Sequence, residues 1–251
     1  MEPTTKTGAI DPGGASPDQG SSPQFAQSRP SDIHTASTAH RYRHYIRTLP
    51  KTLESLATEL HLGPGDRILD YGCADVPYRE FFPHDADYVG ADLPGNARAT
   101  VTINPDGTLP VEQGSFDAVV STQVLEHVQD PPLYLAECFR VLRPGGRLML
   151  STHGIFVYHP DPVDFWRWTS AGLERVLSDA GFEVKELEGV VGLIAIGLQL
   201  VQDATYYKVP AGLRQVLAFT LQRIIALADR LQSPESKRLN ASVYVIVAEK
   251  P

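Results

Sequence analysis

The sequence predicts a doubly wound α/β fold. Short apolar runs at residues 67–69, 115–120 and 147–152 have the length and composition of buried parallel strands. They alternate with stretches of helical periodicity, such as residues 51–62, where leucine and alanine recur at i, i+3, i+4 and i+7. Parallel strands need long crossovers, so this alternation indicates a sheet with helices on both faces.

The composition suits one α/β domain of about residues 40–251. A chain of 251 residues with 42% hydrophobic content can form a real core, and its net charge of -8 argues against a nucleic-acid partner. Residues 1–32 contain almost no large aliphatic side chains, so we expect a disordered tail without a signal peptide. Cys73 and Cys138 lie far apart, which suits a reducing compartment, and we expect a cytoplasmic protein.

The first strand leads into the most informative stretch, residues 66–92. The strand ends in Asp70, a tight turn follows at Gly72, and then we expect a helix and a second strand at 88–91. Glycine removes the Cβ that would obstruct a sharp turn or a ligand lying on it. Asp92 follows 20 residues after Gly72, where an acidic side chain at a strand end can bind both hydroxyls of a ribose.

The turn lacks the glycines of a dinucleotide site. Ala74 and Val76 occupy positions where a pyrophosphate would require close backbone approach. A nicotinamide dehydrogenase is therefore disfavoured, and a nucleoside cofactor without phosphate fits better. Fold alone would not separate the two.

The run Ile-Leu-Asp-Tyr-Gly-Cys-Ala at 68–74 resembles the first motif of the class I S-adenosylmethionine-dependent methyltransferases, in the group with small-molecule, sugar and lipid substrates. Alanine stands in place of the second motif glycine. The resemblance implies a Rossmann-like sheet, mostly parallel with an antiparallel last strand, and S-adenosylmethionine as cofactor. It implies cofactor contacts at Asp70, Gly72, Ala74 and Asp92.

Residues 106–110, Asp-Gly-Thr-Leu-Pro, resemble the family's Asp, two residues, Leu-Pro signature at the adenine. In this resemblance Asp106 accepts from the adenine amino group, and the backbone N–H of Gly107 donates to the ring. A carboxylate and an adjacent amide supply the acceptor and donor that an adenine edge requires. The alternative is an ordinary Asp-Gly turn.

The segment after the fourth strand, residues 121–128, resembles the family's Leu-Glu-His-Val segment. Its position at the open end of a parallel strand places Gln123, Glu126 and His127 near the cofactor. In ubiquinone-type O-methyltransferases, Glu, Glu and His of this segment hold a divalent metal. Here Gln123 replaces the first, so a divalent cation such as Mg²⁺ at Glu126 and His127 and a purely hydrogen-bonding role both stay open.

The fifth strand ends at His153. In the resembling family the loop after this strand faces the methyl-accepting group, which makes His153 the candidate general base. A neutral histidine suits proton removal from a hydroxyl. Glu126 and His127 would orient this base, or bind a metal that lowers the pKa of the hydroxyl.

Residues 156–169 are aromatic, acidic and interrupted by two prolines, so we expect a loop. Aromatic faces beside carboxylates commonly bind sugar rings, and the run resembles segments in methyltransferases of glycan pathways. The alternative is a loop anchored by two buried tryptophans. The candidate acceptor-binding residues are Tyr158, His159, Asp161, Asp164 and Trp166.

The C-terminal part predicts a helix at 170–180, strands at 182–187 and 242–248, and a helical insertion at about 190–235. Within the insertion, residues 190–201 are apolar but too few to span a bilayer. The amphipathic stripe at 213–231 would cover the substrate loop, form a homodimer interface or rest on a membrane surface. The membrane role is the weakest of the three, because Asp229 accompanies the arginines.

The predicted function is therefore S-adenosylmethionine-dependent methylation of a hydroxyl on a sugar, glycan or related small metabolite. Tyr42 and Tyr45, ahead of the first strand, are candidates for a lid over the cofactor, or simply packing aromatics. Two alternatives remain: a non-catalytic cofactor-binding protein that acts through a partner, and an N- or C-methyltransferase of another small molecule.

Overall fold

The computed structural model describes residues 40–160 and 163–251. The expected tail at 1–32 and the candidate residue Asp161 therefore lie outside the described residues. Within these residues the predicted fold class is confirmed: a seven-stranded sheet in the order β3-β2-β1-β4-β5-β7-β6 carries helices on both faces.

The five neighbouring strands β3, β2, β1, β4 and β5 are parallel to one another. Strand β7 runs antiparallel to both of its neighbours, β5 and β6. The antiparallel last strand is as expected. The strands are β1 Arg67–Tyr71, β2 Asp87–Asp92, β3 Val101–Thr102, β4 Phe116–Thr122, β5 Leu142–His153, β6 Glu183–Gly192 and β7 Ala241–Glu249.

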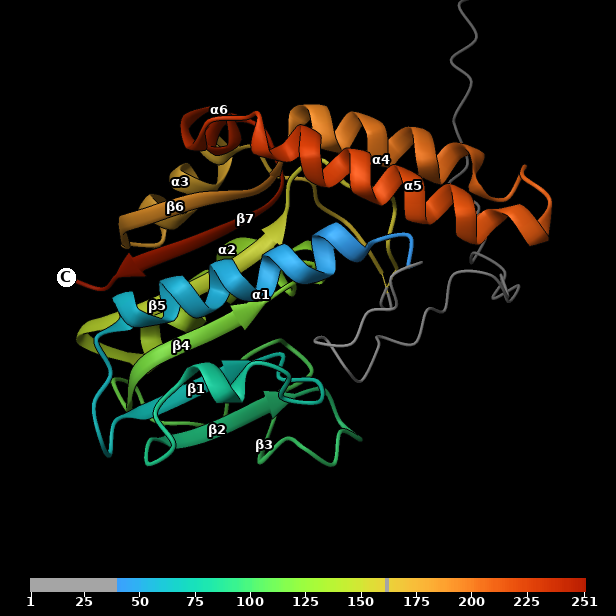
Figure 1. Cartoon of the computed structure of the whole chain (residues 1–251). Coiled ribbons are helices and arrows are strands. Elements are labelled where there is room, and N and C mark those ends of the chain that lie inside the picture. The colour runs from blue at the N-terminus through green and yellow to red at the C-terminus, as the bar shows by residue number, and fades with distance from the viewer. Residues whose placement is uncertain (1–39, 161–162) are drawn as a thin grey trace, which may run out of the picture.

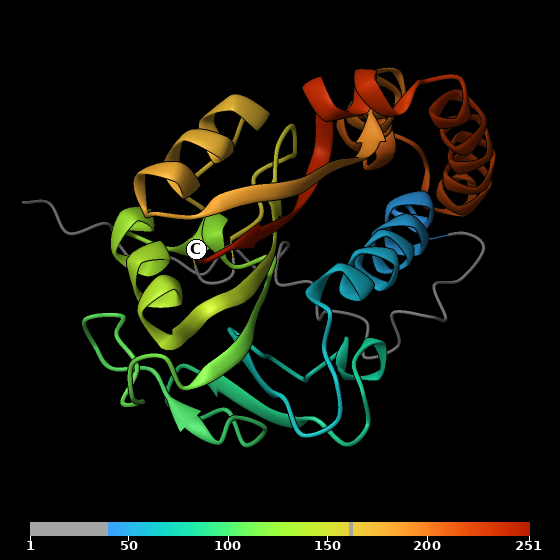
Figure 2. The same cartoon turned by 90° about the vertical axis from the view of Figure 1, so that its left-hand side faces the viewer.

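The helices form two layers. Figure 2 shows α2 and α3 on one side of the sheet and α1, with the C-terminal helices α4 to α6, on the other. Helices α4 to α6 all lie between β6 and β7 in the sequence. The helices are α1 Arg43–Ala57, α2 Pro131–Val141, α3 Ser170–Asp179, α4 Leu193–Tyr206, α5 Ala211–Arg230 and α6 Pro234–Leu239.

The strands are buried on both faces because their side chains alternate between two apolar cores. In β5, Leu148 and Leu150 join the core under α2 and α3, while Met149 joins the core under α1. All three are fully buried. Strands buried in this way read as continuous apolar runs, which is why the sequence reveals them.

The predicted helix between β1 and β2 is wrong. A single 3₁₀ turn, Arg79–Phe81, takes its place. Pro77 and Pro83 bracket this segment and prevent a regular helix. The Arg79 guanidinium donates to the carbonyls of Phe82, Pro83, His84 and Ala86, and so satisfies backbone groups that a helix would have paired.

Two strands extend beyond their predicted bounds. β5 begins at Leu142 directly after α2, and β6 continues to Gly192 beside β7. The reason is tertiary, because neighbouring strands supply hydrogen-bond partners to residues whose local sequence is not strand-like. Among the described residues, no helix combines the length and the hydropathy needed to cross a bilayer.

Candidate functional site

The turn after β1 has a backbone that few side chains tolerate. Gly72 has φ +88°, and a Cβ placed there would lie 2.5 Å from the Val124 side chain. Ala74 and Val76 also have positive φ, at 46° and 59°. Positive φ is a genuine outlier for a β-branched residue such as Val76, and such strain clusters at functional loops.

Asp92 supports this turn from the end of β2. Its Oδ2 accepts from the backbone N–H of Ala74 at 2.9 Å and from Asn96 Nδ2 at 2.6 Å, while Oδ1 accepts from the N–H of Leu93 at 2.8 Å. The Asn96 amide also donates to the carbonyl of Ala74. Sequence reasoning missed Asn96, whose only signal is its closeness to Asp92.

Asp70 is a buried carboxylate at the end of β1. Its side chain accepts from the Tyr88 hydroxyl at 2.8 Å through Oδ2, and Oδ1 has no hydrogen-bond partner among the described residues. Burial raises the pKa of Asp70 to about 7, against the opposing effect of the Tyr88 hydrogen bond. A buried oxygen without a partner is a position where a ligand donor fits.

The Asp106 turn lies beside the same edge of the sheet. The Tyr71 hydroxyl donates to the carbonyl of Gly107, and the Tyr71 ring stacks on Tyr134 with 4.3 Å between centroids. Asp106 is exposed, and hydrogen bonds from Thr108 lower its pKa. The strand end and the turn are therefore held together, with the carboxylate accessible.

Gln123 links α1 to the sheet. It has φ +57°, its Oε1 accepts from the Tyr45 hydroxyl at 2.9 Å, and its Nε2 donates to Ser151 Oγ at 3.1 Å. The candidate lid residue Tyr45 thus reaches the end of β4.

Glu126 and His153 form a buried pair. His153 Nδ1 lies 3.1 Å from Glu126 Oε1, and Thr152 Oγ1 donates to Glu126 Oε2 at 2.9 Å. Glu126 is fully buried and His153 is 2% exposed. Burial raises the pKa of Glu126 to about 7, although hydrogen bonds to its own backbone and from Thr152 oppose the rise.

His127 is paired with other groups than Glu126. Its Nδ1–H donates to the carbonyl of Val163 at 2.6 Å, and its ring centroid lies 6.0 Å from that of His159. Glu126 and His127 therefore do not converge. No group of three His, Cys, Asp or Glu residues in 40–160 and 163–251 could hold a metal ion. Of the two roles left open by the sequence, a divalent cation at Glu126 and His127 therefore does not fit the residues that the structure describes.

An aromatic cluster covers His153. The Phe156 ring is stacked on the imidazole with 4.1 Å between centroids and 4° between planes. The ring centroids of Tyr42 and Tyr45, at the start of α1, lie 6.1 and 5.5 Å from that of Phe156. The His159 ring packs edge-on against His153, with 5.8 Å between centroids. The two candidate lid tyrosines therefore lie over the predicted base, at the end of β5.

The loop at 156–169 is attached to the Glu126–His153 pair through its backbone. The N–H of Phe165 donates to the carbonyl of Glu126, and that of Trp168 to the carbonyl of His153. Asp164 is ion-paired with Arg167 and accepts a hydrogen bond from the N–H of His159. Its carboxylate oxygens are therefore mostly engaged in hydrogen bonds within the loop.

Two aromatic side chains of this loop remain exposed. Tyr158 is 68% exposed and Trp166 is 39% exposed, with the indole N–H of Trp166 donating to the carbonyl of Val128.

A small pocket of about 20 Å³ lies beside the aromatic cluster. The start of α1, the loop after β5, β6, β7, α4 and α5 all contribute to its lining. It has room for about one water, so an acceptor must widen it. Its lining includes Tyr42, Tyr45, Phe156, Gln199, Asp203 and Ile225.

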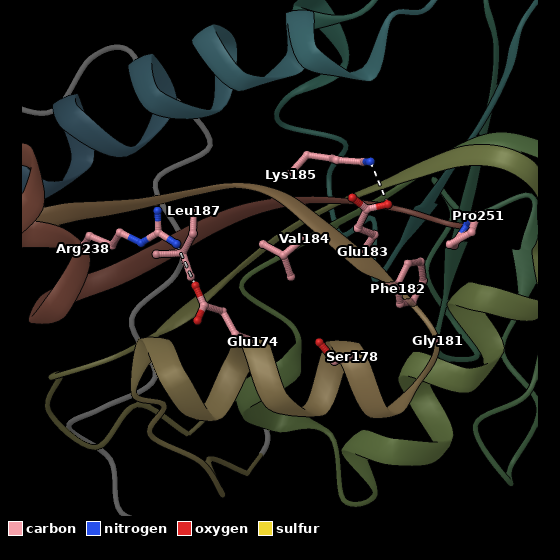
Figure 3. Close-up of a pocket in the computed structure, with 10 residues that line it drawn as sticks. All are labelled: Glu174, Ser178, Gly181, Phe182, Glu183, Val184, Lys185, Leu187, Arg238 and Pro251. Carbon is pink, nitrogen blue, oxygen red and sulfur yellow. Dashed lines mark hydrogen bonds and ion pairs between the residues drawn. The ribbon is translucent and has the colours of Figure 1, made fainter.

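A more open pocket lies elsewhere in the described residues. It has about 520 Å³ between α3 and β6, near the C-terminus, and Figure 3 shows ion pairs Lys185–Glu183 and Arg238–Glu174 beside it. These charges neutralise one another, and none of the candidate residues lies there.

A family model described as a methyltransferase domain matches residues 39–187, which include all the strand ends described above. The chain belongs to the class I S-adenosylmethionine-dependent methyltransferases. Part of its sequence is 40% identical, over 88 residues, to a "probable S-adenosylmethionine-dependent methyltransferase" of Mycolicibacterium smegmatis, covering 33% of this chain and 34% of the relative. A ubiquinone biosynthesis O-methyltransferase of Xanthomonas oryzae is 33% identical over 118 residues, 41% of this chain and 49% of the relative.

This methyltransferase chain thus spans between a third and a half of the length of the curated relatives it matches. Among solved structures, a geranyl diphosphate methyltransferase in complex with geranyl diphosphate (GPP) and sinefungin is similar, with TM-score 0.53, 18% identity and coverage of 85% and 82%. The [4+2]-cyclase SpnF is similar too, with TM-score 0.50, 20% identity and coverage of 80% of each chain. These likenesses show the shared fold, which also carries other chemistry.

The residues at the strand ends fit the S-adenosylmethionine of this family. The unpartnered Asp70 oxygen, the positive-φ turn at Gly72 to Ala74 and the Asp92 carboxylate line one edge of the sheet. Asp92 has a free lone-pair site in addition to its three hydrogen bonds, and can accept from ribose.

Proposed function

We propose that this protein methylates a hydroxyl group of a sugar or related small acceptor, with His153 as the general base. The observation that carries the proposal is the buried Glu126–His153 pair at the end of β5, with 3.1 Å between Nδ1 and Oε1. An imidazole whose Nδ1 faces a carboxylate is held in one orientation, and its positive charge is stabilised after it takes a proton.

The cofactor residues act before any proton moves. Asp92 would accept from the ribose hydroxyls, Asp106 and the Gly107 N–H would take the adenine edge, and the Asp70 to Ala74 turn would face the amino-acid part. When bound, the cofactor supplies an electrophilic methyl group on a sulfonium. The protein's own contribution is to hold the acceptor oxygen in line with that carbon.

The acceptor would enter between α1, the loop after β5 and α4. His153 is buried, so a neighbouring side chain must move before a hydroxyl can reach the imidazole, and Phe156, stacked on its face, is our candidate. Rotation of one aromatic ring would also widen the pocket that Phe156 lines. His153 would then take the hydroxyl proton as the oxygen attacks, and Glu126 would stabilise the imidazolium.

The aromatic loop supports the choice of a sugar-type acceptor. The exposed rings of Tyr158 and Trp166 offer apolar faces to the C–H side of such a ring. Asp164 is engaged with Arg167, so we assign hydroxyl recognition to His159 and to Asp161, which lies outside the described residues. An acceptor held by stacking should depend on Trp166 mainly through KM.

The test is methyl transfer from labelled S-adenosylmethionine to a panel of polyols, sugars, phenols and amines, with products identified by mass spectrometry. We expect a methyl ether, and we expect His153→Ala to lower kcat by roughly 10² to 10⁴ without changing cofactor affinity. The exposed His84→Ala is the matched control and should keep wild-type turnover. Methylated amine, or normal turnover in His153→Ala, would contradict the proposal.

A further inference from the structure

The outer face of the α4–α5 hairpin is apolar and uncovered among the described residues. The two helices pack against one another and extend past the end of the sheet toward which β4 and β5 point (Figure 1). The buried side of α5 centres on Ala218, Gln222 and Ile225. The large apolar side chains on the other side are 46–76% exposed: Ile194 and Val201 of α4, then Leu213, Val216, Ile224, Leu227 and Leu231.

The exposed charges of the α4–α5 hairpin have one sign. Lys208, Arg223 and Arg230 are exposed. The segment from 193 to 231 contains two acidic residues, and both turn inward. Asp229 is 3% exposed and binds His44, Lys237 and the N–H of Gly192. Asp203 is half-buried among Gln199 and Tyr42.

Asp229 therefore does not disfavour a membrane role. The sequence pattern assigns Asp229 to the polar face of the amphipathic stripe, whereas the structure places it inside, in ion pairs. The exposed face is therefore apolar and cationic without an exposed acid, in a protein of net charge -8.

We propose that the outer face of the α4–α5 hairpin binds an anionic lipid surface. Apolar side chains from Ile194 to Leu231 would enter the headgroup boundary, and Arg223 and Arg230 would meet lipid phosphates. The hairpin lies in the plane of the surface and does not span it. An anionic membrane accommodates both the exposed apolar side chains and the exposed cationic side chains of this face.

A second copy of the chain fits the face less well. In a two-fold dimer the same patch meets itself, so the arginines of one copy would approach the arginines of the other. Like charges brought together in this way cost free energy, whereas an anionic surface neutralises each of them.

The α4–α5 hairpin also borders the candidate acceptor site. Gln199 and Asp203 of α4 and Ile225 of α5 line the small pocket beside Phe156 from the buried side of the hairpin. Binding through the outer face would therefore hold the acceptor entrance at the lipid surface. Lipid binding itself does not depend on methyl transfer, so it can be tested separately from the proposed function.

The test is co-sedimentation of the full chain with phosphatidylcholine vesicles, with and without phosphatidylglycerol. We expect binding only to the anionic vesicles, and weaker binding at high salt because exposed charges are screened. The double variants Val216→Glu/Leu227→Glu and Arg223→Glu/Arg230→Glu should each weaken binding at least roughly tenfold.

The controls are Leu133→Glu on α2 and Lys51→Glu on α1, which are exposed on other surfaces and should bind as the wild type does. Circular dichroism and light scattering check that each variant is folded and report its oligomeric state. Equal binding by the hairpin variants and controls would overturn the proposal. So would a dimer that does not bind vesicles and that Val216→Glu/Leu227→Glu converts to a monomer.

Discussion

Single residues at the cofactor edge combine backbone strain with buried charge. Ala74, Val76 and Gln123 all have positive φ, although none is a glycine. Left-handed backbone costs an ordinary residue about 1 to 2 kcal/mol. The surrounding hydrogen bonds, chiefly those of Asp92 and Asn96 to the Ala74 backbone, keep the turn in this conformation.

Ala74→Gly should therefore stabilise the protein. Glycine removes the strain at φ +46° but increases the entropy of the unfolded chain, so we expect a net gain of about 0.5 to 1 kcal/mol in the free energy of unfolding. Urea denaturation measures it. The matched control is Ala97→Gly in the neighbouring loop, which lacks positive φ and should lose stability. A loss in both variants would show that Ala74 is not strained.

Asp92→Asn should weaken S-adenosylmethionine binding by on the order of 2 to 3 kcal/mol, because the ribose hydroxyls lose a charged acceptor. The amide keeps the size of the side chain, which limits disturbance of the Ala74 turn. Calorimetric titration gives the dissociation constant, with the exposed Asp75→Asn as control. An unchanged dissociation constant would show that Asp92 does not bind the ribose hydroxyls.

Burial of Glu126 should make stability depend on pH. Its pKa is about 7 in the folded protein and about 4.3 when unfolded, so the folded state binds more protons between these values. Its contribution to stability therefore falls as pH rises from about 4 to about 7.

We expect Glu126→Gln to remove this contribution, on the order of 3 kcal/mol, and so to gain stability relative to wild type as pH rises. Urea denaturation between about pH 5 and about pH 8 measures the difference, and Asp75→Asn serves again as the exposed control. Parallel curves for Glu126→Gln and wild type would mean that the carboxyl stays ionised in the folded protein.

At the scale of elements, the α4–α5 hairpin fixes the start of α1. The side-chain amides of Gln199, Gln202 and Gln222 all donate to the carbonyl of Arg41, and Gln222 Oε1 accepts from the N–H of His44. This network holds the segment that carries Tyr42 and Tyr45. The helices between β6 and β7 thereby position side chains that lie over His153.

Gln222→Ala should loosen that segment. The part-buried N–H of His44 loses its side-chain partner, and the carbonyl of Arg41 keeps only two of its three amide donors. We expect a cost of about 1 kcal/mol in stability, and amide hydrogen exchange at residues 42–48 should become faster. The exposed Gln215→Ala on the same helix is the control. If both variants exchange alike, the glutamine network does not hold α1.

At the scale of the whole molecule, Asp229 joins three elements. It accepts from His44 of α1 at 2.9 Å and from Lys237 of α6 at 2.8 Å, while it sits on α5 itself. Burial tends to raise its pKa, but these hydrogen bonds outweigh burial and hold the pKa of Asp229 well below its usual range.

A depressed carboxyl pKa stabilises the fold above the unfolded value of about 3.9 and loses that effect as the pH falls. We therefore expect Asp229→Asn to be less stable than wild type at neutral pH, with the difference shrinking in acid. Thermal unfolding from neutral pH to about pH 3 measures it, against the exposed Asp85→Asn. A difference independent of pH would show that packing, not charge, is lost.

The sequence by itself determined the fold class and the carboxyl ends of β1, β2 and β5. Strands buried on both faces appear as uninterrupted apolar runs, and the residues that follow them, Asp70, Asp92 and His153, are local features of the chain. For the same reason the family could be inferred from the turn at Gly72 and the segment at Glu126.

Only the tertiary structure decided which of these side chains meet. Glu126 pairs with His153 of the adjacent strand and not with its sequence neighbour His127, because the pairing of β4 with β5 brings their ends together. Likewise Asp229 turns inward because its partners, His44 and Lys237, come from other helices. Periodicity fixes which face of an element is apolar, but partners distant in the chain are chosen by packing.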